Sequence, residues 1–397
     1  MTIVERTLFP ALKKTLADRR VVVITGMRRV GKTTTLRWLL EQVPSRNKIY
    51  LDLERLDQRA VFQQANYDLV INYLRSLGLD ETRPLTVALD EIQYTENLPS
   101  VIKYLYDHYG IKFLLTGSSS FYLKNFFSES LARRKVIYEL HPLSFGEFLD
   151  FRGIPYRKRT SLEDMRFEVL EYGRLSGYYE EYIKYGGFPD VVLEPSALVK
   201  HEILLDIISS YINIDVRVMA DIRRIGEFQQ LLKLLALRTG SKLDLTKLSK
   251  IIGISRPTLN EYLEFLEMTF VIHRLPAYAG VDKATALGKK LYFRDNGLAS
   301  VLANPGEGAL FENAVFNQLA AYGNLSYLMK SNAYEVDFIL QSAGQGDTAL
   351  EVKYHPLPSD LEKISQISRR NNIAAYWLVG CKPTPGFENF LWGGSIF

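Results

Sequence analysis

Apolar residues in the first third of the chain come in short unbroken runs. Four of these runs, at Val21–Thr25, Lys48–Leu53, Thr86–Leu89 and Lys112–Thr116, have the length and the apolar content of strands that are buried on both faces. The stretches between the runs are amphipathic with helical spacing. This alternation predicts a three-layer α/β domain with a parallel sheet, which we assign to residues 1–140.

The spacing of apolar residues becomes helical after residue 140. Tyr178–Tyr185 and His201–Tyr211 are the clearest examples, and the sequence Gly186-Gly187-Phe188-Pro189 interrupts the region between them. We therefore expect a helical region over residues 141–240, in which the tyrosines of the first segment pack as core.

Two short helices and a strand are predicted next, over residues 241–280. Leu243–Ile252 and Arg256–Leu266 flank the turn Gly253-Ile254-Ser255, with Ser255 placed to cap the second helix and Phe270–Leu275 placed as a following strand. The expected core of this unit consists of Leu248, Ile251, Ile252, Leu259, Leu263 and Leu266. A helix-turn-helix followed by a strand predicts a winged helix.

Length and composition limit the possible classes of protein. A chain of 397 residues is too long for one ordinary core, so two or three domains are expected. The net charge of +4 is small against 49 basic and 45 acidic residues, and it neither favours nor excludes nucleic acid as a partner. Cys381 is the single cysteine, which excludes an internal disulfide and fits a reducing cytoplasm. No apolar run approaches the length that spans a membrane, so no membrane partner is expected.

The first predicted strand leads into a glycine-rich segment with the pattern G-x-x-x-x-G-K-T. The segment consists of Gly26, Met27, Arg28, Arg29, Val30, Gly31, Lys32 and Thr33, with Thr34 following. A strand, such a loop and a helix in this order predict a phosphate-binding loop. Backbone N–H groups and the helix amino terminus would hold the phosphates, Lys32 would span the β- and γ-phosphates, and Thr33 would bind Mg²⁺. The expected cofactors are ATP and Mg²⁺.

The third predicted strand ends in Asp90 and Glu91, and the fourth leads into Gly117 and Ser118. Next to a phosphate-binding loop, Asp90 would complete the Mg²⁺ site and Glu91 would deprotonate the attacking water, which favours hydrolysis over transfer to a second substrate. Ser118 would reach the γ-phosphate or the water. Without the loop, the acidic pair would be a solvated strand end and the serines an ordinary turn.

A basic segment, Leu131-Ala132-Arg133-Arg134-Lys135, follows. In a ring of subunits, one of these arginines could reach the γ-phosphate bound by a neighbour and stabilise the transition state. The alternative is a solvated helix end.

The last part of the chain, residues 281–397, alternates strand and helix again. Phe311-Glu312-Asn313 begins a predicted helix, and Glu335–Leu340 and Ala349–Lys353 are predicted strands. The two-residue period of a strand places Glu351 and Lys353 on one face, and Asp337 precedes Glu351 by fourteen residues. Asp337, Glu351 and Glu312 could hold Mg²⁺ while Lys353 positions water for nuclease chemistry. Such triplets also occur in ordinary strands.

Several of these motifs together resemble a widespread group of prokaryotic AAA+-like ATPases. The shared segments are G-M-R-R-V-G-K-T, A-L-D-E-I-Q, L-L-T-G-S-S-S, E-L-H-P-L-S-F-G-E-F, Y-G-G-F-P and F-E-N, and they extend over nearly the whole chain. The resemblance implies that residues 141–240 form a helical lid, that the carboxyl-terminal domain is related to PD-(D/E)XK nucleases, and that the protein is a homo-oligomer, possibly a ring. Arg134 matches the arginine of the group, whereas Arg133 replaces a glycine.

The expected function is ATP hydrolysis coupled to DNA binding or remodelling. DNA would meet Ser255, Arg256, Thr258 and Asn260 on the second helix of the winged helix, although Glu261, Glu264 and Glu267 on that helix oppose a phosphate backbone. A basic rim of Lys289, Lys290, Arg294 and Lys330 could face phosphates as well. Two alternatives stay open, namely an ATP-regulated, Mg²⁺-dependent DNA endonuclease and a nucleotide-dependent protein-interaction switch without a DNA role.

Overall fold

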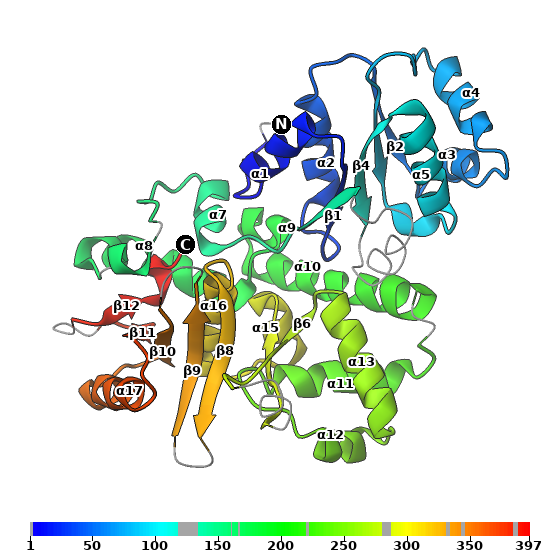
Figure 1. The fold of residues 1–397 in the computed structure, drawn as a ribbon. Helices are drawn as coiled ribbons and strands as arrows, with labels where there is room; N and C mark the ends of the chain where they lie inside the picture. Colours follow the sequence, from blue (N-terminus) through cyan, green and yellow to red (C-terminus); the bar gives the residue numbers. More distant parts are fainter. Residues whose placement is uncertain are drawn as a thin grey trace. The chain divides into compact units, whose positions relative to one another are not determined.

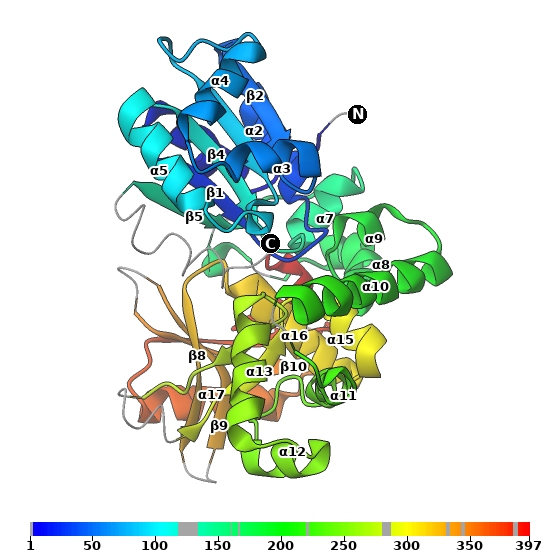
Figure 2. The ribbon, with the colours of Figure 1, turned by 90° about the vertical axis from the view of Figure 1, so that its right-hand side faces the viewer.

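The computed structural model describes residues 3–117, 134–159, 161–165, 167–219, 222–279, 287–330, 334–342, 346–383 and 388–397. The chain forms two compact units, which Figures 1 and 2 show in blue to cyan and in green to red. Unit 1 comprises Met1–His141 and Met268–Phe270, and unit 2 comprises Pro142–Glu267 and Val271–Phe397. Each unit is described by itself below.

Unit 1 contains a five-stranded parallel sheet (Figure 1). Its strands are β1 (Val21–Thr25), β2 (Lys48–Asp52), β3 (Thr86–Asp90), β4 (Lys112–Gly117) and β5 (Lys135–Glu139), in the spatial order β2-β3-β4-β1-β5. The four predicted strands and their parallel arrangement are confirmed. Strand β5, an edge strand that is only half-buried and carries charged residues at both ends, was not predicted from the sequence. The other edge strand, β2, shares these features and was predicted.

Helices cover both faces of this sheet. They are α1 (Phe9–Lys14), α2 (Lys32–Glu41), α3 (Leu56–Phe62), α4 (Asp68–Ser76) and α5 (Leu98–Tyr109), with the short 3-10 helices η1 (Thr15–Ala17) and η2 (Ile92–Tyr94). Val21 and Val23 of β1 pack in one core with α3, α4 and α5, whereas α2 packs against β1, β3 and β4 with its buried Leu36 and Leu39. Burial on both faces explains why the strands are continuously apolar.

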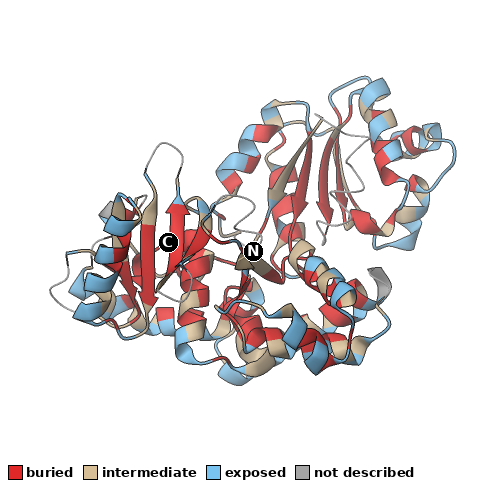
Figure 3. Ribbon diagram, turned by 60° about the horizontal axis from the view of Figure 1, so that its bottom comes forward, coloured by how far each residue is buried: buried red, intermediate tan, exposed pale blue. Residues whose placement is uncertain are grey.

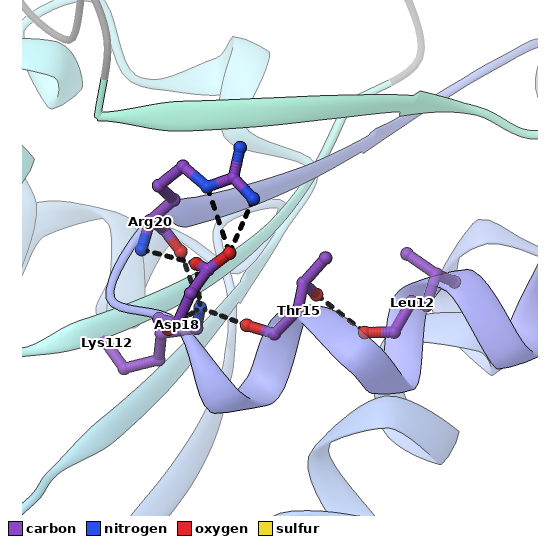
Figure 4. A network of polar contacts seen from close by, with 5 residues as sticks. All are labelled: Leu12, Thr15, Asp18, Arg20 and Lys112. Carbon is purple, nitrogen blue, oxygen red and sulfur yellow. Dashed lines mark hydrogen bonds and ion pairs between the residues drawn. The ribbon is translucent and has the colours of Figure 1, made fainter.

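Lys112, the first residue of β4, fixes the segment that precedes β1 (Figure 4). Its ammonium donates to the carbonyl oxygens of Thr15 at 2.9 Å, Asp18 at 2.8 Å and Arg20 at 2.5 Å. Asp18 in turn accepts hydrogen bonds from the guanidinium and the backbone N–H of Arg20. Burial lowers the pKa of Lys112 to about 8. This network holds the chain at the entrance to β1, next to the central strand β4.

The first part of unit 2 is helical, as the sequence predicts. It contains α7 (Phe145–Phe151), η3 (Leu162–Asp164), α8 (Val169–Tyr185), α9 (Pro189–Leu193), α10 (Ala197–Ser210), a π-helix (η4, Tyr211–Met219) and α11 (Ile225–Ala236). Tyr179 and Tyr182 of α8 are buried and pack their rings against Phe145. These tyrosines are core residues, as expected.

The glycine pair after α8 has a structural role. The backbone N–H of Gly187 donates to the buried carboxylate of Asp295 at 2.7 Å. Gly186 has a φ of 75°, and a Cβ atom there would lie 2.3 Å from Asp295 Oδ1. Burial raises the pKa of Asp295 to about 6. The Y-G-G-F-P segment is thus a tight turn built around a carboxylate that also caps α15 (Asn296–Ala303).

A helix-turn-helix and a two-stranded antiparallel sheet follow α11. The elements are α12 (Leu245–Ile252), α13 (Arg256–Met268), β6 (Ile272–Leu275) and β7 (Lys290–Phe293). The predicted cap is present, because the Ser255 hydroxyl accepts the Thr258 N–H at 3.2 Å. Five of the six predicted core residues are buried, but Ile251 is 44% exposed, so its core assignment is wrong. The strand starts at Ile272, since Phe270 has a left-handed φ of 63° that a strand does not allow.

The end of unit 2 is an α/β region around a second five-stranded sheet. Its strands are β8 (Asn324–Lys330), β9 (Tyr334–Gln341), β10 (Thr348–Lys353), β11 (Ala375–Gly380) and β12 (Phe390–Trp392), in the order β12-β11-β10-β9-β8. The pairs β8/β9 and β9/β10 are antiparallel, and β10/β11 and β11/β12 are parallel.

One helix packs on each face of the second sheet. Ile364 and Ile367 of α17 (Pro358–Arg370) share a core with Val336 and Ile339, whereas α16 (Glu307–Leu319) packs Phe316 against Phe338. A 3-10 helix, η5 (Gly393–Ser395), follows β12. Figure 3 shows buried strands in both units beside helices with exposed outer faces. Cys381, just after β11, is buried. None of the helices in the described ranges is long and apolar enough to cross a bilayer.

Candidate nucleotide site and carboxylate cluster

The glycine-rich segment connects β1 to α2 and depends on its two glycines. Gly26 has a φ of 155° and Gly31 a φ of 95°. A Cβ atom on Gly26 would lie only 2.1 Å from the carbonyl oxygen of Leu140, so no side chain fits there. Gly31 is the N-cap of α2, whose ten residues begin at Lys32. The loop therefore ends at a helix amino terminus, where unpaired N–H groups and the helix dipole favour an anion.

Lys32 lies inside this loop. Its side chain is 4% exposed, and its ammonium donates to the carbonyl oxygen of Met27 at 2.7 Å. Thr33 is half-buried and Thr34 is exposed in the first turn of α2. The loop residues predicted from the sequence thus come together around one buried ammonium.

Parallel pairing brings Asp90 and Glu91 to the same edge of the sheet as the loop. The register sets Thr25 beside Gly117 and Leu89 beside Leu115, so the carboxyl ends of β1, β3 and β4 lie together. Asp90 is 2% exposed. One of its oxygens accepts the hydroxyl of Thr116, and the other accepts the hydroxyl of Tyr50 at 2.7 Å. Burial and the Asp90 carboxylate raise the pKa of Tyr50, so Tyr50 stays a donor.

Glu91 has a left-handed backbone with a φ of 52°. Its N–H donates to the Thr116 hydroxyl at 3.2 Å, and its carboxylate accepts the side-chain amide of Gln93. Thr116 therefore links the two acidic residues. A non-glycine residue in this conformation is uncommon and is held there by its surroundings.

Sequence reasoning missed Tyr50, Thr116 and Gln93 as partners of the acidic pair. Tyr50 and Thr116 are polar positions in or next to apolar strands, which is a signal, but their convergence on Asp90 follows only from the strand order. Ser118, which was predicted to reach the phosphate, lies outside the described residues, as does Arg133.

Arg134 lies at the opposite end of the strands from the loop, where β1 and β5 begin. It immediately precedes β5, whose first residue pairs with Val21 at the start of β1. Its guanidinium is 3.4 Å from Asp107 Oδ1. The loop begins after Thr25, so four residues of strand, about 13 Å at ~3.3 Å per residue, separate the two ends. Arg134 is therefore badly placed to serve the loop of its own subunit.

The residues predicted to contact DNA lie at the start of α13. Ser255 and Arg256 are exposed, and Thr258 and Asn260 are half-buried. The Ser255 hydroxyl contacts both the N–H and the hydroxyl of Thr258, the latter at 2.8 Å. Further along the same helix, Glu261 and Glu264 are exposed, which confines any anion contact to the first turn.

The predicted nuclease residues come together in unit 2. Asp337 on β9 and Glu351 on β10 lie directly next to the antiparallel pair Phe338 and Leu350. Asp337 Oδ2 accepts the N–H of Val352 at 2.9 Å. The Lys353 ammonium is 2.8 Å from Glu351 Oε1. Glu312 of α16 accepts the Tyr292 hydroxyl at 2.7 Å.

Lys290 was predicted to lie on a phosphate-facing rim, and this prediction is wrong. Its side chain is 3% exposed, and its ammonium contacts Glu312, Glu335 and Asp337. Lys289 and Lys330 are exposed, as a rim requires. Lys290 is the first residue of β7, whose four residues are all buried, whereas Lys289 precedes the strand.

Burial and neighbouring charges shift the pKa values of four residues in this cluster. Burial and the neighbouring Asp337 raise the pKa of Glu312 to about 8 and that of Glu351 to about 7. The surrounding carboxylates outweigh burial for Lys290 and Lys353, and they raise the pKa of both ammonium groups. Both lysines are charged at neutral pH.

Comparison with known families assigns the first unit. Residues 18–149 match a family described as an AAA domain. Residues 176–307 match a domain of unknown function, DUF8612, and residues 307–385 match another, DUF4143.

Relatives are similar over most of the chain. A protein of Methanocaldococcus jannaschii is 28% identical over 372 residues, which cover 91% of this chain and 79% of that protein. A protein of Haemophilus influenzae is 28% identical over 343 residues, covering 82% and 80%. Both are described as uncharacterised.

Solved structures give weaker similarity. A RuvB structure from Thermotoga maritima has 15% identity and a TM-score of 0.33, and the match covers 69% of this chain and 89% of that one. The Aeropyrum pernix ORC1 protein in complex with DNA has 14% identity and a TM-score of 0.33, covering 79% and 93%. The loop and the parallel sheet have the arrangement of a P-loop nucleotide-binding domain, and residues 18–149 match the family described as an AAA domain.

Proposed function

We propose that this protein is an ATPase that couples ATP binding and hydrolysis to the binding or remodelling of DNA. The observation that carries the ATPase part is the convergence of the glycine-rich loop, Asp90 and Glu91 at one edge of the parallel sheet. Phosphate binding needs the glycine-rich loop, and hydrolysis needs Asp90 and Glu91 beside it.

Each residue of the site has a proposed role. The N–H groups of residues 26–34 and the Lys32 ammonium bind the phosphates of ATP. Thr33 and Asp90 are the residues that would hold Mg²⁺, which neutralises phosphate charge when bound. Glu91 takes the proton of the attacking water, and Ser118 contacts the γ-phosphate or that water. The hydroxyls of Thr116 and Tyr50 fix Asp90 in place.

We also propose that the protein forms a homo-oligomeric ring, which the position of Arg134 supports. Arg134 lies at the end of the strands opposite its own loop, which suits a guanidinium that acts on the nucleotide of a neighbouring subunit. In such a role it stabilises the charge that develops on the transferred phosphoryl group.

Measurements of ATP binding and phosphate release test the ATPase part. Lys32→Ala removes the buried ammonium and is expected to abolish nucleotide binding. Glu91→Gln keeps the size of the side chain and removes its basicity, so ATP is expected to bind while turnover falls by about 10² or more. A Glu91→Gln protein that releases phosphate at an undiminished rate would remove Glu91 as the base.

The DNA part rests on the helix-turn-helix and the β6/β7 pair of unit 2, which are the elements of a winged helix. The exposed Arg256 and the amino terminus of α13 can meet phosphates, and Lys247 and Lys250 are exposed on α12. The acidic residues later in α13 keep this contact to the first turn.

A DNA-binding titration with duplex, single-stranded and branched DNA, with and without ATP, tests this part. Arg256→Ala is expected to weaken binding several-fold and to reduce its salt dependence, whereas Glu264→Ala should not weaken it. If none of these DNA types binds in the presence of ATP, the DNA role is refuted and a nucleotide-dependent protein-interaction switch becomes the function.

A further inference from the structure

Three carboxylates of unit 2 surround one buried ammonium, that of Lys290. Lys290 is the first residue of β7, Glu312 lies on α16, and Glu335 and Asp337 lie on β9. The Lys290 nitrogen is 3.4 Å from Asp337 Oδ1 and 3.7 Å from Glu312 Oε1, and it forms a closer ion pair with Glu335. The carboxylates of two separate elements therefore share a single cation supplied by a third.

The ammonium has little freedom to leave this position. Lys290 is 3% exposed, and its backbone is paired with Leu275 in the β6/β7 sheet. The nitrogen also lies 5.7 Å from the centre of the Tyr327 ring, a distance that allows a cation–π contact. A swing into solvent would break the strand position or leave the buried carboxylate of Asp337 without this cation.

Several oxygens of the cluster have donors of their own. Asp337 Oδ2 accepts a backbone N–H, Glu312 accepts the Tyr292 hydroxyl, and Glu351 Oε1 faces Lys353. Glu351 Oε2 is buried without a hydrogen-bond partner in the part of the chain that the structure describes. Mg²⁺ requires about six oxygen ligands in a near-octahedral arrangement. Among the described residues, no group of three His, Cys, Asp or Glu side chains is arranged to hold a metal ion.

We propose that the Lys290 ammonium is the resident cation of this carboxylate cluster and that it excludes the divalent ion which a nuclease-like domain would require. Unit 2 therefore does not cleave nucleic acid at Asp337, Glu351 and Lys353. This inference does not depend on the proposed ATPase activity, because it concerns residues of unit 2 alone.

Two ammonium groups already face the carboxylates of this cluster. The Lys290 nitrogen is 3.4 Å from Asp337 Oδ1, and the Lys353 nitrogen is 2.8 Å from Glu351 Oε1. The two lysines therefore supply positive charge at the place where an active nuclease would hold Mg²⁺.

Metal binding to the whole chain tests the inference directly. Thermal unfolding of the nucleotide-free protein is followed with and without millimolar Mn²⁺, and Fe²⁺ with ascorbate and peroxide is used to cut the backbone near bound metal. We expect Mn²⁺ to stabilise the wild-type protein no more than it stabilises Asp337→Asn. We also expect no backbone cuts next to residues 312, 337 or 351. A stabilisation that is lost in Asp337→Asn, or cuts at these positions, would overturn the proposal. Cuts near residue 32 report the nucleotide loop and are distinguished by fragment mass.

Lys290→Gln supplies a gain-of-function test, with Lys289→Gln as the matched control on the exposed neighbour. Removal of the ammonium leaves the carboxylates unbalanced, so we expect Lys290→Gln to unfold at a lower temperature than Lys289→Gln. Mn²⁺ should then raise the unfolding temperature of Lys290→Gln and leave that of Lys289→Gln unchanged. Equal stability of the two variants, or a destabilised Lys290→Gln that Mn²⁺ does not restore, would show that the ammonium does not occupy the place of an ion.

Discussion

Asp90 shows how single residues of the nucleotide site depend on hydroxyl donors from neighbouring strands. Its two oxygens accept Thr116 and Tyr50, so the carboxylate has one orientation. A carboxylate that is to hold Mg²⁺ gains affinity when it is oriented in advance by a second layer of donors. These hydroxyls therefore belong to the site as much as the acidic pair itself.

Tyr50→Phe is expected to weaken the use of Mg²⁺ in ATP hydrolysis. The change removes only the hydroxyl that donates to Asp90, so the Mg²⁺ concentration for half-maximal turnover should rise by about 10-fold. The measurement is phosphate release against Mg²⁺ at saturating ATP. Tyr104→Phe is the control, because the Tyr104 hydroxyl donates at 2.8 Å to Asp68, an acid outside the site. An unchanged Mg²⁺ requirement in Tyr50→Phe would contradict the role of Tyr50.

The buried glutamates of unit 2 should make stability depend on pH. The pKa of Glu351 is 4.5 as a free group and about 7 in the fold. Between these values the folded state binds more protons than the unfolded state, so the free energy of unfolding falls as the pH rises, and the effect is complete above about 7.

Glu351→Gln should remove this contribution. From pH 5 to pH 8 the wild-type protein is expected to lose on the order of 1 kcal/mol of unfolding free energy relative to the variant. Urea unfolding at both pH values measures the difference, and Glu264→Gln, on an exposed face of α13, serves as the control. Parallel pH profiles for the wild type and Glu351→Gln would refute the assignment.

At the scale of elements, apolar patterns predicted much of the fold. Strands buried between helices on both faces are continuously apolar, so β1, β3 and β4 could be read from the sequence. The edge strand β5 lacks this pattern and was missed. The predicted strand at Phe270 began too early because the backbone there is left-handed, a property that the apolar pattern does not reveal.

The site could be predicted only where its residues are neighbours in sequence. The loop from Gly26 to Thr34 and the Asp90-Glu91 pair are local motifs, and the structure places both at one sheet edge. Tyr50, Thr116 and Lys290 act through contacts between distant segments, and their partners follow from strand order and register rather than from spacing along the chain.

Gly26→Ala tests whether the loop between β1 and α2 tolerates a side chain. The added Cβ atom would lie 2.1 Å from the Leu140 carbonyl oxygen, so the loop or the end of β5 must move. We expect a loss of more than about 2 kcal/mol in unfolding free energy and weaker ATP binding in calorimetry. Gly78→Ala is the control, since its φ is also positive, at 83°, but nothing lies within 4 Å. That variant should lose only about 1 kcal/mol, and equal losses would exclude a steric role for Gly26.

At the scale of the whole molecule, the position of Arg134 predicts that subunits complete one another. Arg134→Ala and Lys32→Ala should each abolish most ATP turnover. A mixture of the two is expected to regain part of the activity, because a Lys32→Ala subunit can lend Arg134 to a neighbour that binds ATP. The measurement is phosphate release after mixing at several ratios.

The control for this experiment is a Lys32→Ala/Arg134→Ala double variant mixed with Arg134→Ala. That mixture contains no subunit able to supply the arginine, so it should stay inactive. If the first mixture is no more active than its components, Arg134 does not act between subunits.

An internal ammonium cannot be taken away by a chelator. If Lys290 is the cation of its cluster, EDTA leaves the second unit folded and unchanged, whereas it stops ATP turnover by removing free Mg²⁺. Every divalent-ion requirement of the intact molecule then reports on the nucleotide loop alone, and ligand binding by the second unit can be studied in EDTA buffers.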